Sequence, residues 1–300
     1  MSVLITGAGG MLGRYLADEF KEEKIVTLGL RPEATFSVDL TKETPSFGSE
    51  YFETVVHAAG TEDAASAMAL NLEGTKRLLQ ALEDNPPENF VYVSSYKVYS
   101  RDAGENLSED TNLWASDETG RSKALAEQYL REWCERNDVT LSIIRPARMF
   151  GEGVTGETLQ LFNDALSGKY IHIRGNDARV SIVCALDVAR GIKGIYDMGG
   201  IYNAADPDPV RFIDMVEALT ANAGAKKRMT HLPASWAEWL WRLGKFIPSV
   251  NRNLHPEVVE ARLKSLTLDG SRFAAAAGFS YYNTLRVIER QDPAYPYSSL

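Results

Sequence analysis

The chain has 300 residues, of which 44% are hydrophobic and 24% are charged, as in an ordinary globular protein. This composition excludes a disordered chain and a fibrous repeat. The length predicts about two domains, with a core large enough to be stable without disulfides. Acidic residues outnumber basic ones, 41 against 32, which gives a net charge of −9. A generic nucleic-acid binder shows the opposite balance, so we expect a small-molecule partner and no nucleic acid.

The residues that bind metals or form disulfides are scattered along the chain. Cys134 and Cys184 lie far apart, and neither belongs to a pair with metal-binding spacing. The four histidines are equally dispersed, so we predict no metal site. No stretch approaches ~18 consecutive apolar residues and no signal-peptide pattern precedes the first strand, so we expect no membrane association. Free, buried thiols then predict a cytoplasmic protein.

The first half of the chain alternates strand-like and helix-like segments. An apolar run at Val3–Thr6 ends in a glycine cluster and is followed by a helical pattern of leucines. We predict further strands over residues 24–28, 35–38, 53–58, 89–94 and 140–145, and helices over about 63–83 and 117–136. Strands that alternate with helices indicate parallel βαβ units. Continuous apolar strands indicate a sheet covered on both faces.

The alternation of strand-like and helix-like segments becomes less regular after Pro146, where glycines and prolines become frequent. We predict a helix over 186–196, a strand over 200–203 and mainly helical structure from about 209. The predicted fold is therefore α/β: a Rossmann-type doubly wound parallel sheet with a smaller, mixed C-terminal substrate domain. Its dinucleotide-binding domain covers 1–150 and also about 180–205. Residues 151–300 form mainly the substrate-binding domain, interleaved with the first.

A glycine-rich loop lies between the first strand and the first helix. Gly7, Gly10 and Gly13 are spaced by three, and Met11 and Leu12 open the helix. Glycine permits the tight turn and lets the backbone approach a pyrophosphate. The helix N-terminus then presents free N–H groups and a positive dipole end to that anion. This strand–turn–helix context predicts a dinucleotide site.

The end of the second strand bears on the choice between NAD and NADP. An acidic residue there would hydrogen-bond the adenosine ribose, whereas an arginine would suit a 2′-phosphate. The strand ends Leu28-Gly29-Leu30-Arg31, without an acid. We therefore favour NADP, held by Arg31 with help from Arg14, although NAD is possible.

Further motifs follow the glycine loop at characteristic places. They are Asp39-Leu40, His57-Ala58-Ala59-Gly60, Asn71 to Thr75, Ser94 to Tyr99, and Arg145-Pro146 followed by Phe150-Gly151. With the glycine loop, they resemble the extended short-chain dehydrogenase/reductase family, the group of NAD(P)-dependent epimerases, dehydratases and reductases. The resemblance extends over nearly the whole chain.

The resemblance implies roles for individual residues. In this family a tyrosine acts as acid/base on a carbonyl or hydroxyl, and hydride passes to or from the nicotinamide. A lysine four residues after the tyrosine holds the nicotinamide ribose, and its counterpart is Lys123. A serine orients the substrate oxygen, and its counterpart is Ser95. The cofactor is further contacted by the Asp39-Leu40 segment and by the loop Ala58, Ala59 and Gly60.

The tyrosine of the family's YxxxK motif is replaced by Thr119. The segment reads Thr119-Gly120-Arg121-Ser122-Lys123, and its other residues match well. A threonine hydroxyl is shorter than a phenol and far less acidic than a phenol, whose pKa is about 10. General acid/base catalysis needs both reach and a matched pKa.

Several explanations of this replacement stay open. Another acid could serve, with Tyr96 and Tyr99 nearest in the sequence. A water held by Thr119, Ser95 and Lys123 could relay the proton. The threonine could also be an engineered substitution, or the protein could have lost redox turnover.

The substrate side is less defined. Arg145, Arg148 and Arg179 lie near segments expected to line the cleft, and arginine suits phosphate or carboxylate recognition. Residues 236–243 hold three tryptophans that could pack on the core, wall an apolar pocket or dock on a membrane surface. Residues 293–300 are expected to be poorly ordered.

We predict an NAD(P)-dependent oxidoreductase or epimerase/dehydratase acting on a carbonyl or hydroxyl of a small molecule such as a nucleotide sugar. The alternative is a catalytically degenerate NAD(P)-binding sensor or regulatory protein. A homodimer is expected by analogy.

Overall fold

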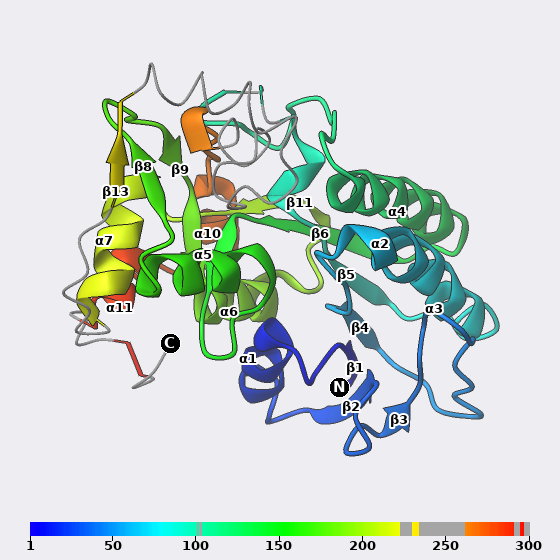
Figure 1. The fold of residues 1–300 in the computed structure, drawn as a ribbon. Helices are drawn as coiled ribbons and strands as arrows, with labels where there is room; N and C mark the ends of the chain where they lie inside the picture. Colours follow the sequence, from blue (N-terminus) through cyan, green and yellow to red (C-terminus); the bar gives the residue numbers. More distant parts are fainter. Residues whose placement is uncertain (101, 103, 223–229, 234–261, 291–294, 297–300) are drawn as a thin grey trace.

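The computed structural model describes residues 1–300 except 101, 103, 223–229, 234–261, 291–294 and 297–300. A seven-stranded sheet in the order β11-β6-β5-β4-β1-β2-β3 forms its centre, and every neighbouring pair of strands is parallel (Figure 1). The strands are β1 Ser2–Thr6, β2 Lys24–Gly29, β3 Phe36–Ser37, β4 Thr54–His57, β5 Asn89–Val93, β6 Thr140–Pro146 and β11 Gly200–Ala204.

Consecutive residues of the central strands enter different hydrophobic clusters. Val3 and Ile5 of β1 lie in one cluster and Leu4 in the other. In β5, Val91 belongs to the first cluster and Phe90 to the second. Because successive side chains of a strand point to opposite faces, the continuous apolar runs bury both faces of the sheet.

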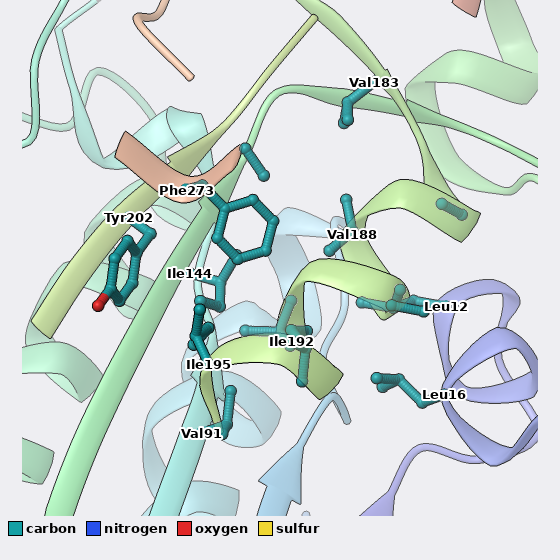
Figure 2. Close-up of a cluster of buried hydrophobic side chains, with 14 of the residues drawn as sticks. Leu12, Leu16, Val91, Ile144, Val183, Val188, Ile192, Ile195, Tyr202 and Phe273 are labelled. Atoms are coloured by element: carbon teal, nitrogen blue, oxygen red, sulfur yellow. The ribbon is translucent and has the colours of Figure 1, made fainter. Parts of the chain in front are cut away.

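One face of the sheet is covered by α1 Met11–Glu19, α6 Ala185–Ile195 and α10 Ser271–Ala277. Figure 2 shows Leu12 and Leu16 of α1 beside Val188 and Ile192 of α6, with Phe273 of α10 completing the cluster. The alanine run of α10 packs against α6, since Gly194 of α6 approaches Ala277 closely.

The opposite face is covered by four helical segments. They are α2 Ala64–Ala67, the π-helical segment η1 Met68–Gly74, α3 Thr75–Ala81 and α4 Glu118–Arg136. The helix predicted over 63–83 is therefore interrupted by a π-helical stretch. Such segments often occur at functional sites, and η1 carries Asn71, whose side chain organises the loop after β4.

The rest of the described chain forms a second packed region. Its strands pair as β10-β7, β12-β9 and β13-β8. A third hydrophobic cluster unites α5, α7 and α11. The elements are η2 Tyr96–Val98, β7 Arg148–Phe150, α5 Gly156–Leu166, β8 Ile171–Ile173, β9 Arg179–Val180, β10 Ile182–Cys184, β12 Val210–Arg211, α7 Phe212–Asn222, β13 Thr230–Leu232 and α11 Thr284–Ile288.

The predicted α/β class and the doubly wound parallel sheet are confirmed, and the division into two domains stays a prediction. The tryptophan-rich residues 236–243 and most of 293–300 lie outside the described residues. Within the described part of the chain, no helix is long and apolar enough to cross a membrane.

Candidate active site

The glycine loop is shaped by close backbone contacts. Gly7 has φ +71°, and a Cβ there would lie 2.7 Å from the amide nitrogen of Ala59. A Cβ on Gly13 would collide with the carbonyl oxygen of Gly7. Larger residues would therefore push the loop away from both β4 and α1. The close approach brings the two predicted cofactor loops, 7–13 and 58–60, together at the carboxyl ends of β1 and β4.

The N-terminus of α1 fits an anionic cofactor. Gly10 is its N-cap and provides no side-chain cap, and the first turn holds no acidic residue. The amides that open the helix at Met11 and Leu12 therefore carry the positive end of the helix dipole without a carboxylate to neutralise it. The Leu12 side chain is itself buried in the core, so its contribution to a site would be its backbone.

A buried hydrogen-bond chain holds the second loop in place. The Ala59 amide donates to Thr6 Oγ1, which lies 2.6 Å from His57 Nδ1. His57 Nε2 lies 2.9 Å from Thr75 Oγ1, which donates to the carbonyl of Asn71. Because Thr75 gives its single proton to that carbonyl, it must accept from Nε2–H. Burial lowers the pKa of His57 to about 3, helped by Lys123, so the imidazole is neutral.

Asn71 joins the same loop to helix α4. Its Oδ1 accepts from the Thr61 amide, and its Nδ2 donates to the Thr61 carbonyl and to Ser122 Oγ. Ser122 Oγ donates in turn to the carbonyl of Thr119. The loop after β4 and the start of α4 are thus coupled by one amide side chain.

Lys123 lies where these two elements meet. Its Nζ donates to the Val93 carbonyl at 2.8 Å and would contact a Cβ added to Gly60. Burial lowers the pKa of Lys123 to about 8, although Glu127 and Glu62 raise it. A side chain at position 60 would therefore displace the ammonium from its present place.

Thr119 is buried one helical turn before Lys123, and its hydroxyl is hydrogen-bonded to the backbone. Thr119 Oγ1 donates to the backbone carbonyl of Glu62 at 3.1 Å. The next residue, Gly120, lies so close to the Lys97 carbonyl that a Cβ would collide with it. This contact sets η2 directly against the start of α4. Ser95 caps η2, since its Oγ accepts from the Lys97 amide.

A cluster of charges includes Lys97 of η2 and Arg148 of β7. Arg148 donates to the Tyr96 hydroxyl at 3.3 Å, and the Lys97 ammonium pairs with Glu157 at 2.9 Å. Burial would lower the pKa of Lys97, but Tyr96, Glu157 and Glu62 raise it overall. Glu62 also interacts with Arg148 and Lys123. Glu62 therefore interacts with the charges of this cluster and with that of Lys123.

The other two candidate arginines and Tyr99 form hydrogen bonds with groups outside this cluster. Arg145 is 1% exposed and donates to both carboxylate oxygens of Glu127, to the Tyr99 hydroxyl and to the Glu109 carbonyl. Tyr99 donates to Asn203 Oδ1. Arg179 is exposed and donates to the Pro209 carbonyl. Of the three arginines, Arg148 is the one that joins the cluster.

The residues proposed for the adenosine end are spread over β2 and the segment after β3. The Arg31 side chain lies over the glycine loop, 2.9 Å from a Cβ added to Gly9. Asp39 accepts from Thr41 and pairs with Lys42, which lower its pKa to about 2. Leu40 is 3% exposed and packs under Gly74. Arg14 donates to the Glu152 carbonyl at 2.7 Å.

Comparisons with known proteins place the chain in a family. Residues 3–205 match the model of the NAD dependent epimerase/dehydratase family. The chain belongs to this family. The family and the class of enzyme predicted from sequence are thereby confirmed, together with a nicotinamide cofactor.

Individual relatives agree with this assignment. The chain is 28% identical over 252 residues to N-acetyl-alpha-D-glucosaminyl-diphospho-ditrans,octacis-undecaprenol 4-epimerase of Escherichia coli O157:H7, covering 77% of this chain and 75% of the relative. UDP-glucuronic acid 4-epimerase from Bacillus cereus, solved in complex with NAD, superposes with a TM-score of 0.74 at 16% identity over 96% of each chain. RMD from Pseudomonas aeruginosa, solved with NADPH, gives 0.69 at 18% identity over 97% of this chain and 98% of that one.

Sequence reasoning missed three charged residues of the cluster: Lys97, Glu62 and Glu157. Lys97 lies inside a quoted motif, and a lysine directly after Tyr96 was a usable signal. Glu62 and Glu157 are separated by 95 positions, yet the Glu157 amide donates to Glu62. No spacing pattern could have paired them. Among the described residues, no group of three or more histidine, cysteine, aspartate or glutamate side chains is arranged to hold a metal ion.

Proposed function

We propose that the protein is an NADP-dependent oxidoreductase or epimerase that acts on a carbonyl or hydroxyl of a nucleotide sugar. The observation that carries this proposal is the junction of the glycine loop, the 58–60 loop and Lys123 at one edge of the sheet. Ligands of open α/β sheets bind at this carboxyl edge. When bound, the nicotinamide supplies hydride transfer, and the protein supplies orientation and proton transfer.

Different residues would bind different parts of the cofactor. Gly7, Gly10, Met11, Leu12 and Gly13 would hold the pyrophosphate through their backbone and the N-terminus of α1.

Ala58, Ala59 and Gly60 would line the central part of the cofactor, and the backbone of Asp39 and Leu40 would lie near the adenine. Lys123 would hold the nicotinamide ribose, because its ammonium already lies against Gly60.

Ser95 would orient the substrate oxygen. Thr119 would contribute through a bound water rather than as an acid, since its own proton is donated to Glu62.

NADP is preferred because Arg31 lies over the loop and β2 supplies no carboxylate at its end. The variant Arg31→Leu should weaken NADPH binding about 10-fold or more, because a charge-assisted contact to the 2′-phosphate is lost. NADH binding should change less than about 2-fold. Paired fluorescence titrations of both cofactors measure this. The control is Arg136→Leu, an exposed arginine at the far end of α4.

Equal losses for NADH and NADPH would contradict the preference for NADP. A failure of the wild-type protein to bind either cofactor would overturn the proposed function.

The sugar substrate is best sought among glycosyl diphosphates. The similar proteins include one enzyme of a UDP-sugar and one of a lipid-linked diphosphosugar. Both share the sugar diphosphate, so a panel should contain UDP-hexoses, UDP-N-acetylhexosamines, dTDP-hexoses and a short-chain polyprenyl diphosphosugar. Product formation is followed by NMR of the sugar ring. Turnover of the lipid-linked compound alone would replace the nucleotide sugar with a lipid carrier.

Two further properties belong to this proposal. Cys134 and Cys184 are buried thiols that form no disulfide, which supports a reducing compartment such as the cytoplasm. Leu125 and Tyr129 lie one turn apart on α4 and are 38% and 37% exposed, which supports a homodimer formed through this helix. Light scattering of Leu125→Glu against the wild-type protein tests the dimer.

A further inference from the structure

The proton that the reaction must move needs a carrier, and Thr119 does not provide one. Its hydroxyl is buried and donates to the Glu62 carbonyl. An aliphatic alcohol also cannot match the acidity that general acid/base catalysis requires. A site that keeps Ser95 and Lys123 therefore needs another group within reach of the same substrate oxygen.

Tyr96 has the required chemistry and the required neighbours. It directly follows Ser95 and begins η2, the turn that lies against the start of α4. Its side chain is partly exposed, whereas Tyr99 is 1% exposed and enclosed by Arg145 and Asn203. Of these two phenols, only Tyr96 can meet a ligand without opening the core.

A cation contacts the Tyr96 hydroxyl. Arg148 donates to it at 3.3 Å, and Lys97 is the next residue along the chain. Arg148 is itself oriented by Thr158 at 3.5 Å and by Glu157 at 3.9 Å. A phenol oxygen that accepts from a guanidinium is placed to carry negative charge, because the cation stabilises it.

Glu62 connects this phenol to the predicted catalytic pocket. The Glu62 backbone carbonyl accepts from Thr119, and the Glu62 carboxylate interacts with Lys97, Arg148 and Lys123. Glu62 thus contacts Thr119 and interacts with the charges of both Arg148 and Lys123. This shared neighbour relates the surroundings of Tyr96 to those of Lys123.

We propose that Tyr96 is the acid/base of this enzyme. Arg148 positions the Tyr96 hydroxyl and stabilises negative charge on its oxygen. The proposal rests on the proposed function, since it assigns a residue to that same reaction. In the oxidative direction Tyr96 accepts the proton as the sugar O–H bond breaks. The C–H bond of the same carbon breaks too, its electron pair leaves as hydride to the oxidised nicotinamide, and a C=O bond forms. In the reductive direction Tyr96 returns the proton to the carbonyl oxygen.

The test compares single-turnover rates of three variants with the wild-type enzyme and its best glycosyl diphosphate. Tyr96→Phe keeps the ring and removes the acid, so we expect a loss of at least about 100-fold with NADPH affinity unchanged within about 2-fold. Thr119→Val should cost less than a tenth of that loss. Tyr129→Phe, an exposed tyrosine on α4, is the matched control for a lost phenol.

Rescue by a conservative variant separates catalysis from a structural effect. Arg148→Lys keeps a cation beside the Tyr96 hydroxyl and should retain most of the wild-type rate, whereas Arg148→Gln should lose about 10-fold or more. Retention of turnover within about 3-fold in Tyr96→Phe overturns the proposal, as does a loss in Thr119→Val equal to that in Tyr96→Phe.

A second measurement decides the matter when the panel contains no substrate. Nitration of Tyr96 by tetranitromethane, read by peptide mass spectrometry, should be suppressed by NADP together with UDP-glucose, while Tyr51, which is 46% exposed, stays reactive. Unprotected Tyr96 in protein that binds both ligands overturns the assignment. If neither NADP nor NAD binds, the proposed function itself has failed, which is a different result from active enzyme that does not need Tyr96.

Discussion

Two buried lysines, Lys97 of η2 and Lys123 of α4, differ in how their surroundings act on their charge. Lys123 is enclosed by the sheet edge and donates to a backbone carbonyl, and burial lowers its pKa to about 8. Lys97 is 8% exposed, but its neighbours raise its pKa above the ordinary value. Burial alone therefore does not decide the charge of a lysine. The nearest anionic groups do, and the surroundings of Lys97 and Lys123 differ in how closely anionic groups approach the ammonium.

The carboxylates of the two regions differ in the same way. Glu127 is 1% exposed and accepts from Ser94, Arg131 and Arg145. Glu157 pairs with Lys97, but its side chain is 44% exposed. A buried charge network is sensitive to the loss of one member, whereas water screens an exposed one.

The largest expected effect comes from Glu127→Gln. The substitution leaves Arg145 buried without its counter-charge, so the free energy of unfolding should fall by about 3–5 kcal/mol. Urea denaturation monitored by tryptophan fluorescence measures the change. A loss below about 1 kcal/mol would show that the buried network around Glu127 tolerates charge imbalance as well as the exposed pair of Glu157 with Lys97.

The next effect is the pH dependence of stability that arises from Lys123. Its folded pKa of about 8 lies below the unfolded value of about 10.4, so between them the unfolded chain binds more protons. Stability therefore rises with pH through this window, by at most about 1.4 kcal/mol per pH unit. Lys123→Met should remove this rise when unfolding is measured from pH 7 to 10.

Lys97→Met is the matched control for that measurement. The pKa of Lys97 is raised, so its stabilising contribution is fully present below about pH 10.4 and is lost only as pH rises through the folded pKa. The stability difference between Lys97→Met and the wild-type protein should stay constant from pH 7 to 10. A change in that difference would show that the two lysines are not distinguished as described.

The smallest expected effect comes from Glu157→Gln. The pair with Lys97 is open to solvent on the carboxylate side, so its loss should cost no more than about 1 kcal/mol. Thermal unfolding at low and at high salt measures it, and the difference from the wild-type protein should shrink with salt. A cost near that of Glu127→Gln would erase the contrast between the two regions.

Much of the fold could be predicted from local pattern. The apolar strands, the loop of Gly7, Gly10 and Gly13, and the long helix at 117–136 each follow from residues close together in sequence. The parallel order of the strands follows from their alternation with helices. The π-helical turn at Met68–Gly74 could not be predicted in this way, because its extra residue shows only in the backbone hydrogen bonds.

The candidate site was predictable in part for the same reason. Ser95 and Lys123 were located by motif, and the structure brings their elements together through the contact of Gly120 with Lys97. The hydrogen-bond partners of His57 are 51 and 18 residues away in the sequence. A local pattern therefore could not predict that a neutral His57 joins the strand to the helix.

The sequence by itself determined the family and the parallel sheet. These are local facts, set by residue type and spacing. Only the tertiary structure decided that Thr119 donates to Glu62, that Arg145 belongs to the core, and that Arg148 meets Tyr96. The physical reason is that a charge acquires its role from the groups that surround it, and folding brings those groups from distant parts of the chain.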